Sequence, residues 1–203
     1  MNFAQYNYYI WLDQICSWFG ADNKQINKAL DIGSGNGAFL SGLVQKGLIE
    51  HGYGVDMKTV TPQYESLKYF SRDLTSPSFS EGIPVCEVVF FMNMFHLLSD
   101  ITEVQKYLGA CDSENLIMAI PTKPALDMFE NRHPNINSPD RDVNEFLETT
   151  GYGVYKSCEL VSHYYLKNPL KVLIGGKAEF LAKKIEGMSK KKYYILIWSK
   201  KST

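Results

Sequence analysis

The chain has 203 residues, an apolar fraction of 45% and a net charge of −1, which predict a single globular domain and exclude a disordered chain. Its longest apolar run, Ile83 to Leu98, has 16 residues and contains polar side chains, so it is too short to cross a bilayer as a helix. The four cysteines lie far apart along the chain, which excludes a zinc or redox site of the Cys-x-x-Cys type.

The first half of the chain predicts an N-terminal helix followed by strands and a second helix. Apolar residues recur at three- and four-residue steps between Tyr8 and Phe19, which predicts an amphipathic helix that ends near Gly20. Residues 37–47 have the same helical spacing. Four short apolar segments predict strands, at residues 28–33, 52–56, 66–74 and 85–93. The last of them has the near-continuous apolar character of a strand that is buried on both faces.

The second half of the chain also predicts helices and strands in alternation. Residues 99–109, 140–151 and 176–188 predict helices, and Ser99 is the expected N-cap of the first of them. Residues 121–140 contain four prolines and are predicted to be mostly loop. Three further segments predict strands, at residues 114–120, 152–166 and 191–200.

The order of the elements predicts an α/β fold, because strands that alternate with helices form doubly wound, mostly parallel sheets. We expect one domain over residues 1–203, with a mostly parallel seven-stranded sheet, an antiparallel edge strand and an N-terminal helix. That helix, within residues 1–24, carries the aromatic residues Tyr6, Tyr8, Tyr9 and Trp11. It is either a lid over a ligand or a helix packed on the edge of the sheet.

A glycine-rich segment joins the first predicted strand to a helix. Gly33, Gly35 and Gly37 stand at alternate positions, where glycine adopts positive φ and leaves no Cβ in the way of a ligand. The helix that follows offers free N–H groups to that ligand. The segment lacks the lysine of a phosphate-binding Walker loop and matches the dinucleotide-binding fingerprint only in part.

An aspartate, Asp31, precedes the first glycine by two residues. A carboxylate in that position repels a pyrophosphate at short range and attracts a cationic ligand. The segment LDIGSGNG thereby resembles the first motif, (D/E)-x-G-x-G-x-G, of class I S-adenosylmethionine-dependent methyltransferases. The resemblance implies S-adenosylmethionine as the cofactor, bound by residues of this segment, namely Asp31, Gly33, Ser34, Gly35 and Gly37.

The resemblance continues at the ends of the second and third predicted strands. Asp56 ends the second strand; in the family, an acid there accepts hydrogen bonds from the ribose diol, and Met57 would lie beside the adenine. Asp73 ends the third strand. The resemblance implies that Asp73 accepts a hydrogen bond from the adenine amino group and that the backbone N–H of Leu74 binds the ring.

The segment FFMNMFHLL, which ends the fourth predicted strand, is similar to the pattern N-x-x-x-H-H-L of many small-molecule methyltransferases. The resemblance implies that Asn93 and Met94 line the methionine end of the cofactor. The chain departs from the family in two respects. Leu97 stands where the second histidine is found, and only about ten residues separate the second strand from the third, so the crossover helix there must be very short or missing.

His96 is the candidate catalytic base, because it follows the fourth strand and histidine exchanges protons near neutral pH. A packed or helix-capping histidine is the alternative interpretation. A metal site built from His96, Glu130, His133 and His163 lacks tight ligand spacing, and we expect no metal. Residues 121–140 follow the fifth strand and are the candidate substrate loop.

These features predict an S-adenosylmethionine-dependent methyltransferase that methylates an oxygen, nitrogen or carbon atom of a small-molecule acceptor by in-line transfer. The motif (N/D)-P-P-(Y/F), which binds planar amino groups as in DNA adenine methylation, is absent after the fourth strand. A non-catalytic protein that binds S-adenosylmethionine is one alternative.

An RNA methyltransferase is the second alternative, because the charge is unevenly distributed. Residues 1–150 contain 10 basic and 19 acidic residues, whereas residues 151–203 contain 11 basic and 3 acidic ones. A basic C-terminal quarter is suited to RNA phosphates, although a lysine-rich solvated surface has the same composition. Because the N-terminus lacks a signal peptide and the cysteines form no close pairs, we expect a cytoplasmic protein without a membrane segment.

Overall fold

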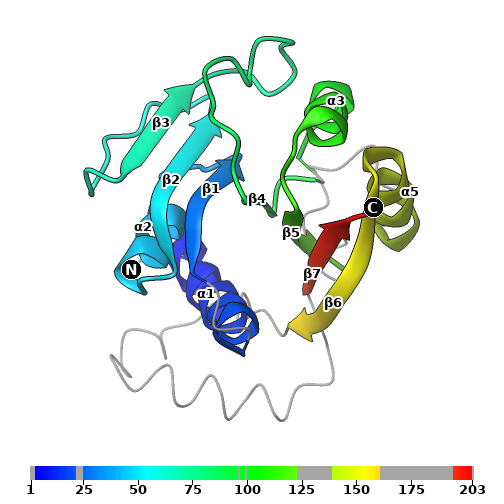
Figure 1. Ribbon diagram of the computed structural model, residues 1–203, viewed down its shortest axis with the longest axis horizontal. Helices are drawn as coiled ribbons and strands as arrows, with labels where there is room; N and C mark the ends of the chain where they lie inside the picture. The colour runs from blue at the N-terminus through cyan, green and yellow to red at the C-terminus, as the bar shows by residue number, and fades with distance from the viewer. Residues whose placement is uncertain are drawn as a thin grey trace.

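The computed structural model describes residues 3–21, 25–95, 97–98, 100–122, 139–160 and 194–202, and within them all side chains except those of residues 3–10, 21 and 139–142. The described residues form a seven-stranded sheet with the order β3-β2-β1-β4-β5-β7-β6 (Figure 1). The strands are β1 (Ile26–Ile32), β2 (Ile49–Asp56), β3 (Leu67–Ser71), β4 (Val88–Met92), β5 (Asn115–Pro121), β6 (Tyr152–Leu160) and β7 (Tyr194–Lys201).

The sheet confirms the predicted fold class. Strands β1 to β5 pair in parallel, whereas β7 pairs antiparallel with both β5 and β6. The antiparallel strand is therefore β7, which lies second from the edge, and β6 is the edge strand beyond it. The order reverses between β1 and β4, and in open α/β sheets a ligand binds at such a switch point, outside the carboxyl ends of the strands.

Helices cover both faces of the sheet. On one face, α1 (Phe3–Ala21) and α2 (Ala38–Gln45) pack over a core that includes Phe90 and Trp198. On the other face, α3 (Thr102–Ala110) and α5 (Pro139–Thr150) enclose a second core around Phe91. Within the described residues, no helix is long and apolar enough to cross a membrane.

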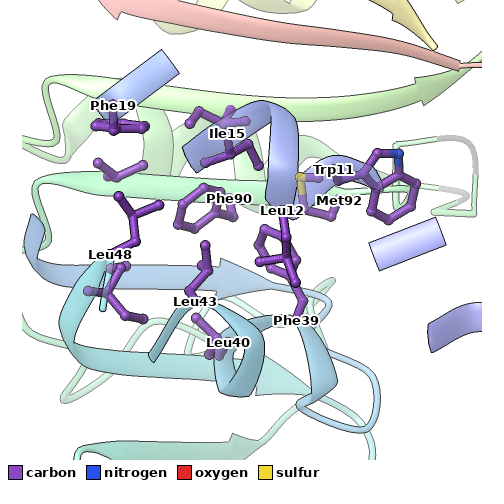
Figure 2. Packing of buried hydrophobic residues seen from close by; sticks show 14 of the residues in the cluster. Trp11, Leu12, Ile15, Phe19, Phe39, Leu40, Leu43, Leu48, Phe90 and Met92 are labelled. Carbon is purple, nitrogen blue, oxygen red and sulfur yellow. The ribbon is translucent and has the colours of Figure 1, made fainter. Parts of the chain in front are cut away.

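The described side chains of α1 belong to the core. Trp11, Leu12, Ile15 and Phe19 are buried and point toward the sheet and α2 (Figure 2). Phe19 stacks on Trp198 with ring centroids 4.5 Å apart. This half of the helix therefore packs on the sheet. Of the four aromatic residues on which the interpretation as a lid is based, Trp11 is buried in this core. The side chains of Tyr6, Tyr8 and Tyr9 lie outside the described set.

The connection between β2 and β3 contains no helix: residues 57–66 form bends and turns. The prediction of a very short or missing crossover is confirmed. The face of β2 that such a helix would cover carries Gly52 and Gly54, and the β3 side chains Leu67 and Tyr69 lie against them.

One predicted helix start is wrong. The helix was expected to begin after Ser99, but α3 begins at Thr102 with Ile101 at the cap position. The carboxylate of Asp100 accepts a hydrogen bond from Thr102 N at 2.8 Å, so an aspartate satisfies the free amide in place of the expected serine. The predicted helix over residues 176–188 lies outside the described residues, as does the end of the strand predicted for 152–166.

Candidate functional site

The glycine loop follows β1 and leads into α2. Gly33, Gly35 and Gly37 have φ values of 80°, 57° and 76°, in the left-handed region that favours glycine. Gly33 N and Ser34 N both donate hydrogen bonds to Val55 O, at 2.8 and 3.1 Å. The start of the loop is thereby attached to the end of β2. All three glycines adopt the positive φ that the sequence predicted for them.

Asp56 lies beside this loop, as predicted from the end of the second strand. Its Oδ2 accepts a hydrogen bond from Gly35 N at 2.9 Å, and its Oδ1 accepts one from Lys58 N at 3.0 Å. A carboxylate oxygen has two lone pairs, so each oxygen keeps capacity for a ligand hydroxyl. The adjacent Met57 is 72% exposed and is free to lie against a ligand.

Three buried oxygen atoms near the loop lack a hydrogen-bond partner: Asp31 Oδ1, Ser34 Oγ and Asn93 Oδ1. Among the described residues only one other buried side-chain oxygen or nitrogen, Ser199 Oγ, is in this condition. Buried polar atoms are normally paired. Because Asp31 is in β1 and Asn93 follows β4, and these strands are parallel neighbours, the acceptors gather at the carboxyl end of the sheet.

The pKa of the Asp31 carboxyl group lies well above its ordinary value. Burial, and after it the charge of Asp56, raise the pKa of Asp31 to about 8, because a buried carboxylate loses hydration and is repelled by a second one. The side chain is 2% exposed. A cation placed beside it would offset both effects, so the site favours a ligand with a positively charged group.

Asn93 and Met94 also lie at the loop. Asn93 has φ of 58°, which is uncommon for a residue other than glycine, and its N–H donates to Ala119 O at 2.9 Å. The side chain of Met94 occupies the space where a Cβ on Gly33 would be. The structure therefore brings the end of β4 against the start of the glycine loop.

Asp73 and Leu74 follow β3, whose end is attached to β2 by a hydrogen bond from Arg72 N to Asp56 O at 2.8 Å. Leu74 is buried, whereas Asp73 is exposed. The Oδ1 atom of Asp73 accepts hydrogen bonds from Thr75 N and Thr75 Oγ1. These two bonds hold the pKa of Asp73 below its ordinary value, so the carboxylate is ionised and forms part of a turn.

The candidate base His96 lies outside the described residues. The same holds for Glu130, His133 and His163 of the suggested metal site, and for residues 123–138 of the candidate substrate loop. Across the part of the chain that the structure describes, no three metal-binding side chains come together.

Sequence reasoning did not identify Tyr69. Its hydroxyl donates a hydrogen bond to Gly37 O at 3.1 Å, although the residue belongs to β3 and is two strands away from β1. The available signal was the pair Gly52 and Gly54 in β2, since glycines at alternate positions of a strand leave room for large side chains of a neighbour.

Comparison with solved structures places this architecture among methyltransferases. The methyltransferase domain of bacterial CtHen1-C is 15% identical, covers 100% of both chains and has a TM-score of 0.64. An S-adenosylmethionine-dependent methyltransferase from Clostridium acetobutylicum is 11% identical over 100% of this chain and 93% of that one, with a TM-score of 0.62. Magnesium protoporphyrin IX methyltransferase from Synechocystis, crystallised with S-adenosylhomocysteine, is 14% identical over 100% and 89%, with a TM-score of 0.61.

The chain therefore has the fold of class I, Rossmann-like S-adenosylmethionine-dependent methyltransferases. No protein-family model matches the sequence, and no curated protein matches it. The family resemblance seen in the glycine motif is confirmed at the level of the fold.

Proposed function

We propose that this protein is an S-adenosylmethionine-dependent methyltransferase that acts on a small-molecule acceptor. The observation that carries the proposal is the set of unpartnered buried oxygens of Asp31, Ser34 and Asn93 around a glycine loop. The amino-acid part of S-adenosylmethionine bears an ammonium group, whose N–H donors and positive charge satisfy buried acceptors beside an acid with a raised pKa.

The residues present fit the rest of the cofactor. Asp56 accepts hydrogen bonds from Gly35 N and Lys58 N beside the loop, and it would accept further ones from a ribose diol. The exposed Met57 would lie against the adenine. Asp73 and the backbone of Leu74 would bind the edge of the ring. Asn93 and Met94 would line the methionine end, as the sequence motif implies.

The bound cofactor supplies a methyl group on a positively charged sulfur with a neutral leaving group. The task of the chain is therefore mainly to hold the two reactants in line and to exclude water, and orientation of this kind contributes much of a rate enhancement. A base is needed only for a protonated acceptor. We assign that role to His96, which takes a proton from a hydroxyl, phenol or ammonium acceptor.

The neighbours in structure act on different acceptors. One is a magnesium protoporphyrin IX methyltransferase, another the plantazolicin methyltransferase BpumL. The fold therefore leaves the acceptor open. A small molecule is our choice because the acceptor-side motif resembles that of small-molecule enzymes. We further propose a cytoplasmic location, because the four cysteines are free thiols.

Calorimetric titration of the purified protein with S-adenosylmethionine and S-adenosylhomocysteine tests cofactor binding. Micromolar binding of both, without binding of a nicotinamide dinucleotide, is the expected result, and absence of binding contradicts the proposal. Incubation with methyl-labelled cofactor, a metabolite extract and total RNA then tests turnover. Label that appears in small molecules supports the assignment, label in RNA supports the alternative, and binding without any label transfer identifies a non-catalytic binder.

A further inference from the structure

Tyr69 crosses from the edge of the sheet to the glycine loop. It pairs in register with Gly54 of β2, and its ring fills the space that a Cβ on Gly54 would occupy. The ring also lies where a Cβ on Gly37 would be. The side chain thus spans the whole width of β2, and both of these contacts depend on glycine in the neighbouring backbone.

The hydroxyl of Tyr69 is attached to the first turn of α2. It donates a hydrogen bond to Gly37 O at 3.1 Å, and that carbonyl also accepts the helical N–H of Ser41 at 3.1 Å. The side chain of Ser41 lies beside the same hydroxyl. Burial raises the pKa of Tyr69 to about 12, so the hydroxyl keeps its proton at neutral pH and remains a donor.

The side chain of Tyr69 lies on a face of β2 that no crossover helix covers. In a βαβ unit the crossover helix covers the strands that it connects, but residues 57–66 between β2 and β3 form no helix. Instead, Leu67 lies against Gly52 and Tyr69 against Gly54. Two β3 side chains therefore cover this face of β2, and Tyr69 reaches the glycine loop beyond it.

The glycine loop is held at three points by β2 and β3. Val55 O binds its start through Gly33 N and Ser34 N, Asp56 binds its middle through Gly35 N, and Tyr69 binds its end through Gly37 O. We propose that Tyr69 is a positioning residue that holds the glycine loop and the first turn of α2 in the geometry that receives S-adenosylmethionine. The proposal rests on the function proposed above.

The test compares Tyr69→Phe with Tyr152→Phe. Tyr152 is a matched control, because it is also a tyrosine whose hydroxyl donates to a backbone carbonyl, Ser113 O at 2.8 Å, but it belongs to the core on the opposite face. Loss of one neutral hydrogen bond corresponds to roughly a 2- to 10-fold change. We expect Tyr69→Phe to weaken binding of S-adenosylmethionine and S-adenosylhomocysteine by about this factor, and Tyr152→Phe to leave both affinities unchanged.

Two further readouts separate positioning from general destabilisation. Amide hydrogen exchange of residues 33–41, measured without ligand, is expected to be faster in Tyr69→Phe than in the wild type and unchanged in Tyr152→Phe. In turnover, Tyr69→Phe is expected to raise KM for S-adenosylmethionine with little change in kcat.

The outcomes distinguish this inference from the proposed function. If the wild type binds S-adenosylmethionine and Tyr69→Phe binds it equally well, the role of Tyr69 is overturned while the proposed function stands. If the wild type does not bind it, the proposed function is overturned. In that case the proposed effect of Tyr69 on cofactor binding is overturned as well. Amide hydrogen exchange of residues 33–41 then shows whether Tyr69 stabilises the loop.

Discussion

The carboxylate of Asp56 accepts a hydrogen bond from the backbone N–H of Gly35, with 2.9 Å between Oδ2 and the nitrogen. This bond joins the end of β2 to the centre of a loop that lies 21 residues earlier in the chain. A carboxylate bound to backbone amides is fixed in direction before a ligand arrives, so it loses little freedom on binding. The relationship makes Asp56 both a support of the loop and a candidate ribose acceptor.

Replacement of Asp56 by alanine is expected to weaken binding of S-adenosylmethionine by roughly 1.5–3 kcal/mol, the range for hydrogen bonds to charged groups. Calorimetric titration measures this loss. Asp100→Ala is the matched control, because Asp100 also accepts a backbone N–H, from Thr102 at 2.8 Å, but lies at the start of α3. Equal affinity in Asp56→Ala and the wild type would contradict the assigned role.

Gly54→Ala is expected to lower the free energy of unfolding by about 1–3 kcal/mol, the usual cost of adding an atom to a packed site. The new Cβ would meet the ring of Tyr69 and, at 2.7 Å, Ser34 Oγ. Gly109→Ala in α3 serves as the comparison, because nothing lies within 4 Å of the added atom. Alanine there is expected to stabilise by about 0.4–1 kcal/mol. Urea unfolding of the two variants measures both values.

Much of the fold could be predicted from local patterns, but the role of Tyr69 could not. The positive φ of the glycines at 33, 35 and 37 follows from glycine at alternate positions between a strand and a helix. The position of Asp56 follows from its place at the end of a strand, because parallel strands end at one edge. Tyr69 acts across β2, and such a contact depends on strand order and register, which the sequence does not encode locally.

The misplaced start of α3 has a similar origin. Both Ser99 and Asp100 are favourable cap residues, and the sequence offers no rule to choose between adjacent ones. Likewise, the sequence marked the antiparallel pair of strands but not the insertion of β7 between β5 and β6, because the order of strands in a sheet is a property of tertiary pairing.

The raised pKa of Asp31 predicts a pH dependence of stability. The carboxyl group has a pKa of about 8 in the folded protein against an ordinary value of 3.8, so between these values the folded state binds the extra proton. Stability therefore falls as pH rises from about 4 to about 8. Asp31→Asn removes the titrating group, and the wild type should lose stability relative to this variant over that window in urea unfolding. Parallel profiles would contradict the prediction.

The same ionisation predicts that cofactor binding is coupled to proton release. Asp31 lies close to both Asp56 and Tyr69, and below about pH 8 it is protonated in the free protein. An ammonium group that binds beside Asp31 favours the ionised form, so the proton must leave when S-adenosylmethionine binds. The affinity of the wild type should therefore rise with pH up to about 8, more steeply than that of Asp31→Asn.

Calorimetry at pH 7 in two buffers of different ionisation enthalpy measures the released proton directly. The titration of the cofactor's own ammonium group is common to both proteins, so the difference between their profiles reports Asp31, and an equal proton release from both would show that this carboxyl group does not face the ligand.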